Sequence, residues 1–244
     1  MKSFYFPPEA WPSAPGQVCQ LGGSEAHHLL KVLRAKEGEQ VRLFDGCGNE
    51  GLFRLTEGSK SKAWLTAEEL THHPAPNAKV ILAIGWAKAL RRSWLLEKAV
   101  ELEATEIWLW QARHSQGKLP EEIKETWQGQ LIAGAKQCGN PWLPVLRTFP
   151  KGLDSLLEAS QDLQARFLLW EDQQQQRLLT DHDLGAASTL YLLGPEGGFS
   201  QDEVDAALAG GLVAVSLGKR ILRWETAALL CLGLSWWARG LGSP

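Results

Sequence analysis

Five short apolar runs after residue 78 constrain the fold of this chain most strongly. Segments with helical periodicity separate them, and the runs occupy residues 79–86, 106–111, 165–171, 188–194 and 212–218. Helices are expected at residues 93–103, 127–138, 201–211 and 223–239. Apolar runs of this length without polar alternation are typical of strands buried on both faces. Because such strands, joined by helices, form mainly parallel sheets, this part of the chain predicts an α/β domain.

The first 72 residues follow a different pattern. Short β-prone segments at residues 39–46, 51–58 and 62–70 are separated by Gly, Asp, Asn or Ser turns, which predicts a small β-rich domain. Residues 73–78 contain two prolines and few apolar side chains, so we expect a linker. The expected organisation is a β domain at 1–72, a linker at 73–78 and an α/β domain at 79–244.

Composition narrows the function without naming it. The chain has 244 residues and a net charge of -3, so any RNA contact must come from local basic clusters. No apolar run of about 20 residues could span a membrane, and we expect a cytoplasmic protein with no membrane partner. The four cysteines form no CxxC pair, so neither a zinc site nor another metal site is expected.

Residues 46–51 match the GxGxxG pattern of dinucleotide-binding proteins. The residues that follow, LFRLT, are β-prone rather than helical, so no helix N-terminus is available for a pyrophosphate. A glycine-rich hairpin is the favoured interpretation.

Two glycine loops in the α/β domain carry the main functional signal. The first, LGPEGGFS at residues 193–200, follows an apolar run, and Ser200 and Glu203 form a capping box that starts a helix. The second, residues 215–223, also lies between a strand and a helix. A plain tight turn is the alternative for either loop. Together they favour a ligand site, because parallel sheets bind ligands at the carboxyl ends of their strands.

Charged residues near these loops are candidates for chemistry. Arg223 and Glu225 stand at the start of the last predicted helix. Basic clusters occur at Arg34 with Lys36, at Lys88 with Arg91 and Arg92, and at Lys219 with Arg220 and Arg223. A solvated face explains any one cluster, whereas several together suit a phosphate backbone.

These residues resemble the RsmE-type family, the 16S ribosomal RNA uracil-N3 methyltransferases of the SPOUT superfamily. The matching blocks follow the family's order over nearly the whole chain: HLLKVLR at 28–34, LFDGCG at 43–48, EKAVEL at 97–102, LGPEGGFSQDEV at 193–204 and LGKRILRWETAAL at 217–229. The resemblance implies a PUA-like β-barrel followed by an α/β domain with a C-terminal trefoil knot. It also implies S-adenosylmethionine as methyl donor, 16S rRNA of the small ribosomal subunit as partner, and a homodimer.

The resemblance also suggests roles for individual residues. Arg223 would stabilise negative charge on the uracil, Glu225 would orient Arg223 or act as a base, and Glu196 would complement the donor's charge or brace its loop. The expected cofactor-binding residues are Leu193, Gly194, Gly198, Leu217, Gly218, Ile221 and Leu222, with Trp170 and Glu171 as weaker choices. The expected RNA-binding residues are Arg34, Lys88, Arg91 and Lys98.

The chain departs from the family pattern at residues 136–141, KQCGNP, where an acidic and a basic residue are replaced. Two alternatives stay open at this point. One is a knotted methyltransferase that acts on transfer RNA or on a ribose 2′-hydroxyl, and the other is a non-catalytic RNA-binding module that kept the fold.

Overall fold

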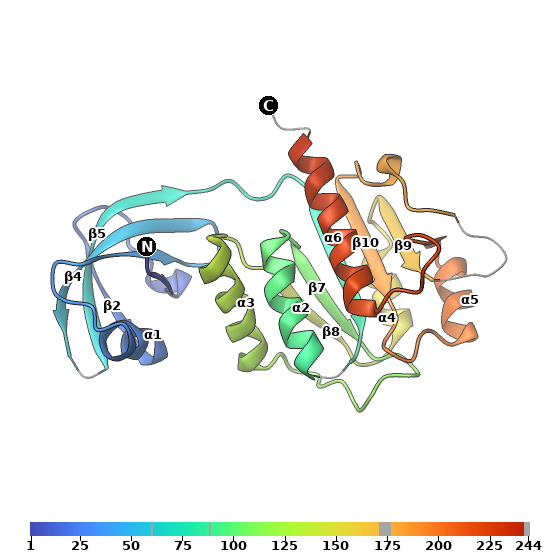
Figure 1. Ribbon diagram of the computed structural model, residues 1–244, viewed down its shortest axis with the longest axis horizontal. Coiled ribbons are helices and arrows are strands. Elements are labelled where there is room, and N and C mark those ends of the chain that lie inside the picture. The colour runs from blue at the N-terminus through green and yellow to red at the C-terminus, as the bar shows by residue number, and fades with distance from the viewer. Residues whose placement is uncertain (60, 88, 171–176, 242–244) are drawn as a thin grey trace. The chain divides into compact units, whose positions relative to one another are not determined.

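The computed structural model of the protein describes residues 1–59, 61–87, 89–170 and 177–241 (Figure 1). The chain forms two compact units. Unit 1 comprises Met1–Ala75 and Ala135–Leu143, and unit 2 comprises Pro76–Gly134 and Pro144–Pro244.

Unit 1 is built on a five-stranded sheet in the order β1-β3-β4-β5-β2. Its strands are β1 (Ser3–Tyr5), β2 (Val18–Gly22), β3 (Gln40–Phe44), β4 (Asn49–Gly58) and β5 (Lys62–His72). Neighbouring strands are antiparallel except for β1 and β3. The helix α1 (Gly23–His27) continues into a π-helical turn, His28–Val32, and a short 3-10 helix spans Pro8–Ala10. The sheet curls around a core that includes Phe4, Leu29 and Phe53 (Figure 1), as the predicted β domain requires.

The GxGxxG segment is a hairpin, as predicted. It joins β3 to β4, which pair antiparallel up to Phe44 and Glu50. Gly46 and Gly48 have φ values of 77° and 91°, in the left-handed region that favours glycine. A Cβ at Gly48 would also lie 2.8 Å from the His73 carbonyl oxygen. The glycines therefore serve a tight turn rather than a nucleotide.

The segment that departs from the family pattern packs within unit 1. Lys136 Nζ lies 2.9 Å from Glu25 Oε2, Arg42 Nη2 donates to the Gly139 carbonyl at 2.9 Å, and Trp142 Nε1 donates to the Pro74 carbonyl at 3.1 Å. Lys136, which replaces the family's acidic residue, thus has a partner inside this chain.

Unit 2 contains a six-stranded, fully parallel sheet in the order β11-β9-β10-β6-β7-β8. Its strands are β6 (Lys79–Gly85), β7 (Glu106–Trp110), β8 (Val145–Phe149), β9 (Ala165–Leu169), β10 (Ser188–Leu193) and β11 (Val213–Val215). Its helices are α2 (Ala89–Glu101), α3 (Glu125–Cys138, whose last turn belongs to unit 1), α4 (Leu153–Ser160), α5 (Gln201–Ala209) and α6 (Trp224–Leu241), and a 3-10 turn spans Asp181–Asp183. The predicted α/β architecture is confirmed, and the trefoil knot stays a prediction.

Alternation along the central strand β10 explains the two layers of helices. Leu190 and Leu192 belong to a core that also contains Leu156 of α4 and Val204 of α5. The intervening Tyr191 points to the other face, where its hydroxyl lies 2.7 Å from Ser235 Oγ of α6. Successive side chains of a strand point to opposite faces. A strand apolar at nearly every position is therefore covered on both sides.

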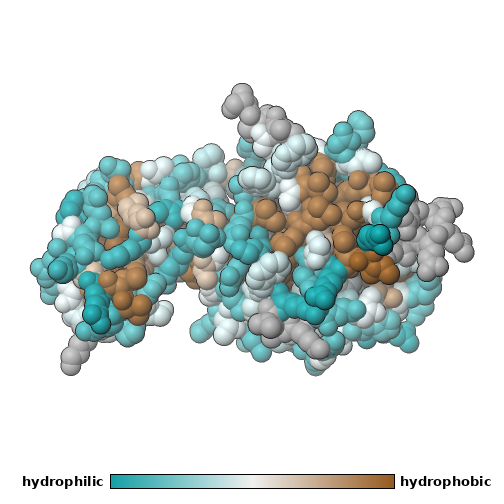
Figure 2. Space-filling view, viewed as in Figure 1, coloured by the Kyte–Doolittle hydropathy of each residue, from teal (hydrophilic) through white to brown (hydrophobic). Residues whose placement is uncertain are grey.

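Large apolar side chains remain exposed on α6 and α2 of unit 2. Trp236 and Trp237 are 46% and 58% exposed, Leu230 is 38% exposed, and Trp94 of α2 is 44% exposed. Figure 2 shows hydrophobic surface over the α6 region of this unit. Within the described ranges, no helix combines the length and apolar character that a membrane crossing requires.

Candidate functional site

A cavity of about 530 Å³ lies in unit 2 at the carboxyl ends of β9, β10 and β11. Both glycine loops contribute to its wall. Among the predicted cofactor-binding residues, those that line it are Leu193, Gly194, Gly198, Leu217, Ile221 and Leu222. Trp170 lines it as well, whereas Glu171 lies outside the described residues. The structure therefore brings together two loops that are separated in sequence.

The first glycine loop, residues 193–200, is held closely by its surroundings. Ser200 and Glu203 form the predicted capping box at the start of α5. Beneath the loop, a Cβ on Gly85 would lie 2.6 Å from Pro195 Cδ, and a Cβ on Gly194 would lie 3.2 Å from the Phe199 ring. Phe199 in turn stacks on Trp110 at 5.8 Å between ring centroids. Glycine at positions 85 and 194 lets backbone and ring approach closely.

The second glycine loop, residues 215–223, is shaped by Gly218. This residue has a φ of 132°, and its N–H and carbonyl both bond to Ser216 Oγ. Gly218 does not line the cavity, and an added Cβ would meet nothing within 4 Å. Its importance is therefore conformational, since a side chain there would strain the backbone rather than crowd a ligand.

Two of the predicted catalytic carboxylates share one arginine. Arg91 Nη1 lies 3.2 Å from Glu196 Oε1 and 3.7 Å from Glu225 Oε1. The Glu196 and Glu225 side chains are only 18% and 13% exposed. The Arg91–Glu196 pair lacks hydrogen-bond geometry. Within the described part of the chain, the buried oxygens Glu196 Oε1 and Glu225 Oε2 accept no hydrogen bond. Arg91 and Glu196 line the cavity, with Glu225 behind them.

Arg223 differs from Arg91 because its side chain has no partner among the described residues. Both Arg223 and Arg220 line the cavity and are exposed. Among residues that the structure describes, the side chains of Arg220, Arg223 and Lys219 have no hydrogen-bond or ion-pair partner. Their positive charges are thus available to an anionic ligand.

The predicted RNA-binding residues are dispersed. Arg34 is an exposed residue of unit 1 with a φ of 49°, and Lys98 pairs with Glu101 at 2.6 Å in unit 2. Lys88 lies outside the described residues. Of the three described members of this set, Arg91 lines the cavity, and Arg34 and Lys98 do not.

Arg92, from the same basic cluster, is buried. Its guanidinium stacks 3.9 Å from the Trp86 ring centroid and donates to the Ala87 carbonyl at 2.7 Å. Burial lowers the pKa of this guanidinium. Arg92 is therefore a packing residue rather than a phosphate contact.

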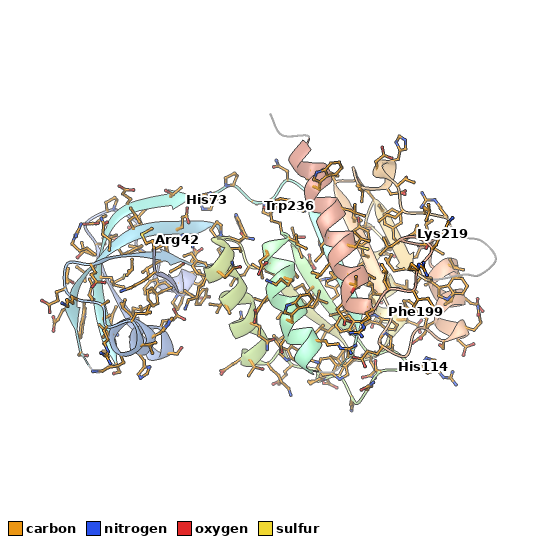
Figure 3. All side chains as sticks on the ribbon, viewed as in Figure 1. Arg42, His73, His114, Phe199, Lys219 and Trp236 are labelled. Carbon is orange, nitrogen blue, oxygen red and sulfur yellow. The ribbon has the colours of Figure 1, made fainter. Side chains whose placement is uncertain are left out.

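Sequence reasoning missed the loop after β7, which braces the first glycine loop from outside the cavity. Gln116 Nε2 donates to Glu196 Oε2 at 3.1 Å, and His114 Nδ1 lies 3.3 Å from the Gly198 carbonyl oxygen. The Arg113 amide donates to Glu203 Oε1 at 2.8 Å. Figure 3 shows His114 near the loop that carries Phe199. No motif marks these residues, because their partners are distant in sequence.

The fold and cavity define an α/β protein with a small-molecule site at strand ends and a β domain before it. Residues 73–236 match the RNA methyltransferase domain family, and residues 21–68 match the RNA methyltransferase PUA domain. The chain therefore belongs to the RNA methyltransferase domain family. Across the described ranges, no three His, Cys, Asp or Glu side chains gather as a metal site would need.

Named relatives and solved structures resemble the chain over most of its length. Ribosomal RNA small subunit methyltransferase E of Bacillus subtilis is 29% identical over 86% of both chains, and that of Mycobacterium tuberculosis is 28% identical over 89% of this chain and 86% of its own. The Neisseria gonorrhoeae enzyme of the same name, solved bound to S-adenosyl methionine, has 28% identity, a TM-score of 0.80 and 95% coverage of both chains. A Legionella pneumophila protein in complex with SAM has 26% identity, a TM-score of 0.87 and 97% coverage of both.

Proposed function

We propose that this protein transfers a methyl group from S-adenosylmethionine to N3 of a uridine in small-subunit ribosomal RNA. One observation carries the proposal. Both glycine loops line a single cavity, and it is also lined by Arg223, whose side chain has no partner in the described part of the chain. The names of the relatives support the same substrate and cofactor.

The cavity fits the methyl donor in size and chemistry. Its volume of about 530 Å³ lies within the range of small-molecule sites, roughly 300–1,000 Å³. Apolar side chains such as Leu193, Leu217 and Trp170 would pack against the adenine faces, and backbone groups of the two loops would bond its edge. Bound S-adenosylmethionine supplies a methyl group that its sulfonium already activates.

The chain's own residues would prepare the acceptor. Uracil N3 carries a proton at neutral pH, so a base or water must take it up, and a cation would stabilise the resulting negative charge on the uracil. Arg223 is the proposed cation, because its guanidinium lines the cavity and pairs with none of the described residues. Glu225, two residues further along, is the proposed base or the group that orients Arg223. The cavity would hold the donor and the uracil close together, which contributes much of the rate.

RNA would be held by exposed cations of the second glycine loop and of unit 1. Lys219 and Arg220 of the second glycine loop are exposed and unpartnered among the described residues, and Arg34 of unit 1 is exposed. Such cations fit phosphates without reading sequence. The PUA domain match of residues 21–68 supports a part for unit 1 in RNA binding.

We also propose that the working form is a cytoplasmic homodimer. The exposed Trp236, Trp237 and Leu230 lie on α6, which packs on α2, the helix that carries the exposed Trp94. A second copy of the chain would cover this apolar face (Figure 2). Light scattering of wild type and Trp237→Glu should give dimer and monomer masses, and a monomeric wild type would contradict the proposal.

A nucleoside digest tests the proposed reaction. Small subunits and, in a parallel reaction, transfer RNA from cells that lack this activity would be incubated with the protein and labelled S-adenosylmethionine, then digested and analysed by mass spectrometry. N3-methyluridine is the expected product. A ribose-methylated nucleoside, a product in transfer RNA alone, or donor binding without transfer would contradict the proposal and favour one of the alternatives.

A further inference from the structure

We propose that Arg91 is a positioning residue that fixes the first glycine loop against the start of α6, and not a contact for RNA phosphates. The inference rests on the proposed function and deepens it, because it assigns the residue that holds the two sides of the reaction site together. Arg91 lies in the first turn of α2, in the basic cluster that sequence patterns associate with RNA.

The guanidinium of Arg91 connects three elements. Its Nη1 atom lies 3.2 Å from Glu196 Oε1, in the first glycine loop, and 3.7 Å from Glu225 Oε1, in the first turn of α6. The carboxylate of Glu196 also accepts from Gln116 Nε2 at 3.1 Å through its other oxygen. One side chain of α2 therefore contacts both the first glycine loop, on the proposed donor side, and the start of α6, on the proposed acceptor side.

An arginine suits this place better than any other cation. Glu196 and Glu225 are both largely buried, so two unshared negative charges would repel each other and lose solvation. The guanidinium is a planar fork whose Nη1 atom faces both carboxylates at ion-pair distances, whereas a lysine is a compact, strongly hydrated point charge. The bridge consequently depends on the shape of the side chain as well as on its charge.

The contacts of Arg91 with Glu196 and Glu225 also fix the position of Arg223. Arg223 immediately precedes α6, and Glu225 is the second residue of that helix. Holding Glu225 against Glu196 thus sets the position of Arg223 relative to the glycine loop that lines the donor cavity. Small displacements of reacting groups reduce orientation-dependent rates strongly.

The charge balance argues against a phosphate role for Arg91. Its positive charge already faces two carboxylates. Arg220 and Arg223 line the same cavity without a partner in the described part of the chain, so an incoming phosphate would meet them with no ion pair to break. Arg91 would have to leave both carboxylates unpaired to do the same.

Two substitutions separate the roles. Arg91→Lys keeps the charge and loses the fork, whereas Arg91→Gln loses the charge. For each, single-turnover methylation, donor affinity by calorimetry, and the salt dependence of RNA affinity would be measured. Arg147→Lys is the matched control. Arg147 lies on β8, its Nε atom is 3.8 Å from Glu106 Oε2 on β7, and it does not line the cavity.

We expect turnover to fall about tenfold in Arg91→Lys and about 10² in Arg91→Gln, in the range of misplaced reacting groups. Donor affinity should fall by about fivefold in Arg91→Gln, as a lost charge-assisted contact would produce. The slope of log K against log salt should match that of wild type in both variants. Arg147→Lys should leave all three quantities unchanged.

The contrary result is equally distinct. Wild-type turnover in Arg91→Lys, with a salt slope reduced by about one in Arg91→Gln, would make Arg91 a phosphate contact and overturn the inference. If Arg91→Gln unfolds, turnover is compared among Arg91→Lys, Glu225→Gln and the double variant Arg91→Lys/Glu225→Gln. A bridge predicts that the losses of turnover in the two single variants do not add in the double variant, whereas independent roles predict that they add. If wild type itself transfers no methyl group, the proposed function fails, and the donor titrations still test the bridge.

Discussion

The two glycine loops of unit 2 differ in how firmly the rest of the domain holds them. The first is braced by Gln116 and His114 from outside, by Arg91 from α2 and by the capping box at its end. In the second, the backbone of Ser216 pairs with Arg177 and Leu179. Beyond it, the described polar contacts are those between Ser216 and Gly218 and the bond from the Ala227 amide to the Arg223 carbonyl at the start of α6. Its cations are unpartnered among the described residues, and Ile221 is 87% exposed. Under the proposed function, this contrast predicts a first loop that is preorganised for the donor and a second loop whose free cations receive RNA.

The largest effect is expected from the second loop, at Arg223. Arg223→Ala removes a proposed transition-state donor, so methylation should fall by about 10² or more while donor affinity stays within about tenfold. Single-turnover assays and calorimetry check the two quantities. Normal turnover in Arg223→Ala would remove this residue from the mechanism.

Matched glycine substitutions compare the loops directly. Gly194→Val would press a side chain against the Phe199 ring, already 3.2 Å from an added Cβ, and should weaken donor binding by about 10². Gly218→Val has open space and meets backbone strain instead, so a loss of about tenfold is expected. Equal losses by calorimetry would show that both loops are held alike.

A smaller effect is expected from the brace itself. Gln116→Ala removes a hydrogen bond to the Glu196 carboxylate, and donor affinity should fall by about fivefold, as for a lost bond to a charged group. Gln201→Ala, which removes an exposed bond to Asp205, is the control. If the two variants bind the donor equally well, the loop after β7 does not brace the site.

The smallest expected effect lies outside both loops and concerns how the stability of unit 1 depends on pH. Burial would raise the pKa of Glu50 in unit 1, but hydrogen bonds from His73 and Arg42 outweigh it and hold that pKa below its usual 4.5 (Figure 3). A lowered folded-state pKa stabilises the protein above the unfolded value, and this contribution disappears as pH falls through the folded value. Thermal unfolding of Glu50→Gln should therefore depend less on pH below about 4.5 than that of wild type, and parallel curves would contradict this.

Sequence patterns predicted the elements that continuous burial or local capping defines. Strands β6 and β10 are apolar at nearly every position because helices cover both faces of the sheet. Ser200 and Glu203 mark the start of α5 by their spacing alone. The edge strand β8 was missed because Arg147 and Thr148 interrupt its apolar pattern.

The candidate site was predictable only in part. The loops were visible as glycine-rich segments, so their lining residues could be proposed. The partners of Arg91 and the braces Gln116 and His114 depend on tertiary contacts between distant segments, which no local pattern records. Gly218 was assigned for the space it leaves, whereas its φ of 132° is the constraint that the structure supports.

A crystal structure with S-adenosylhomocysteine bound would test most directly the claim that both loops form one donor site with different tasks. The account predicts the ligand in the cavity of unit 2, with its adenine against the backbone of residues 193–198 and 217–222, Arg91 still between Glu196 and Glu225, and Arg223 free of protein partners. A ligand bound elsewhere, or an Arg91 that has left both carboxylates, would contradict it.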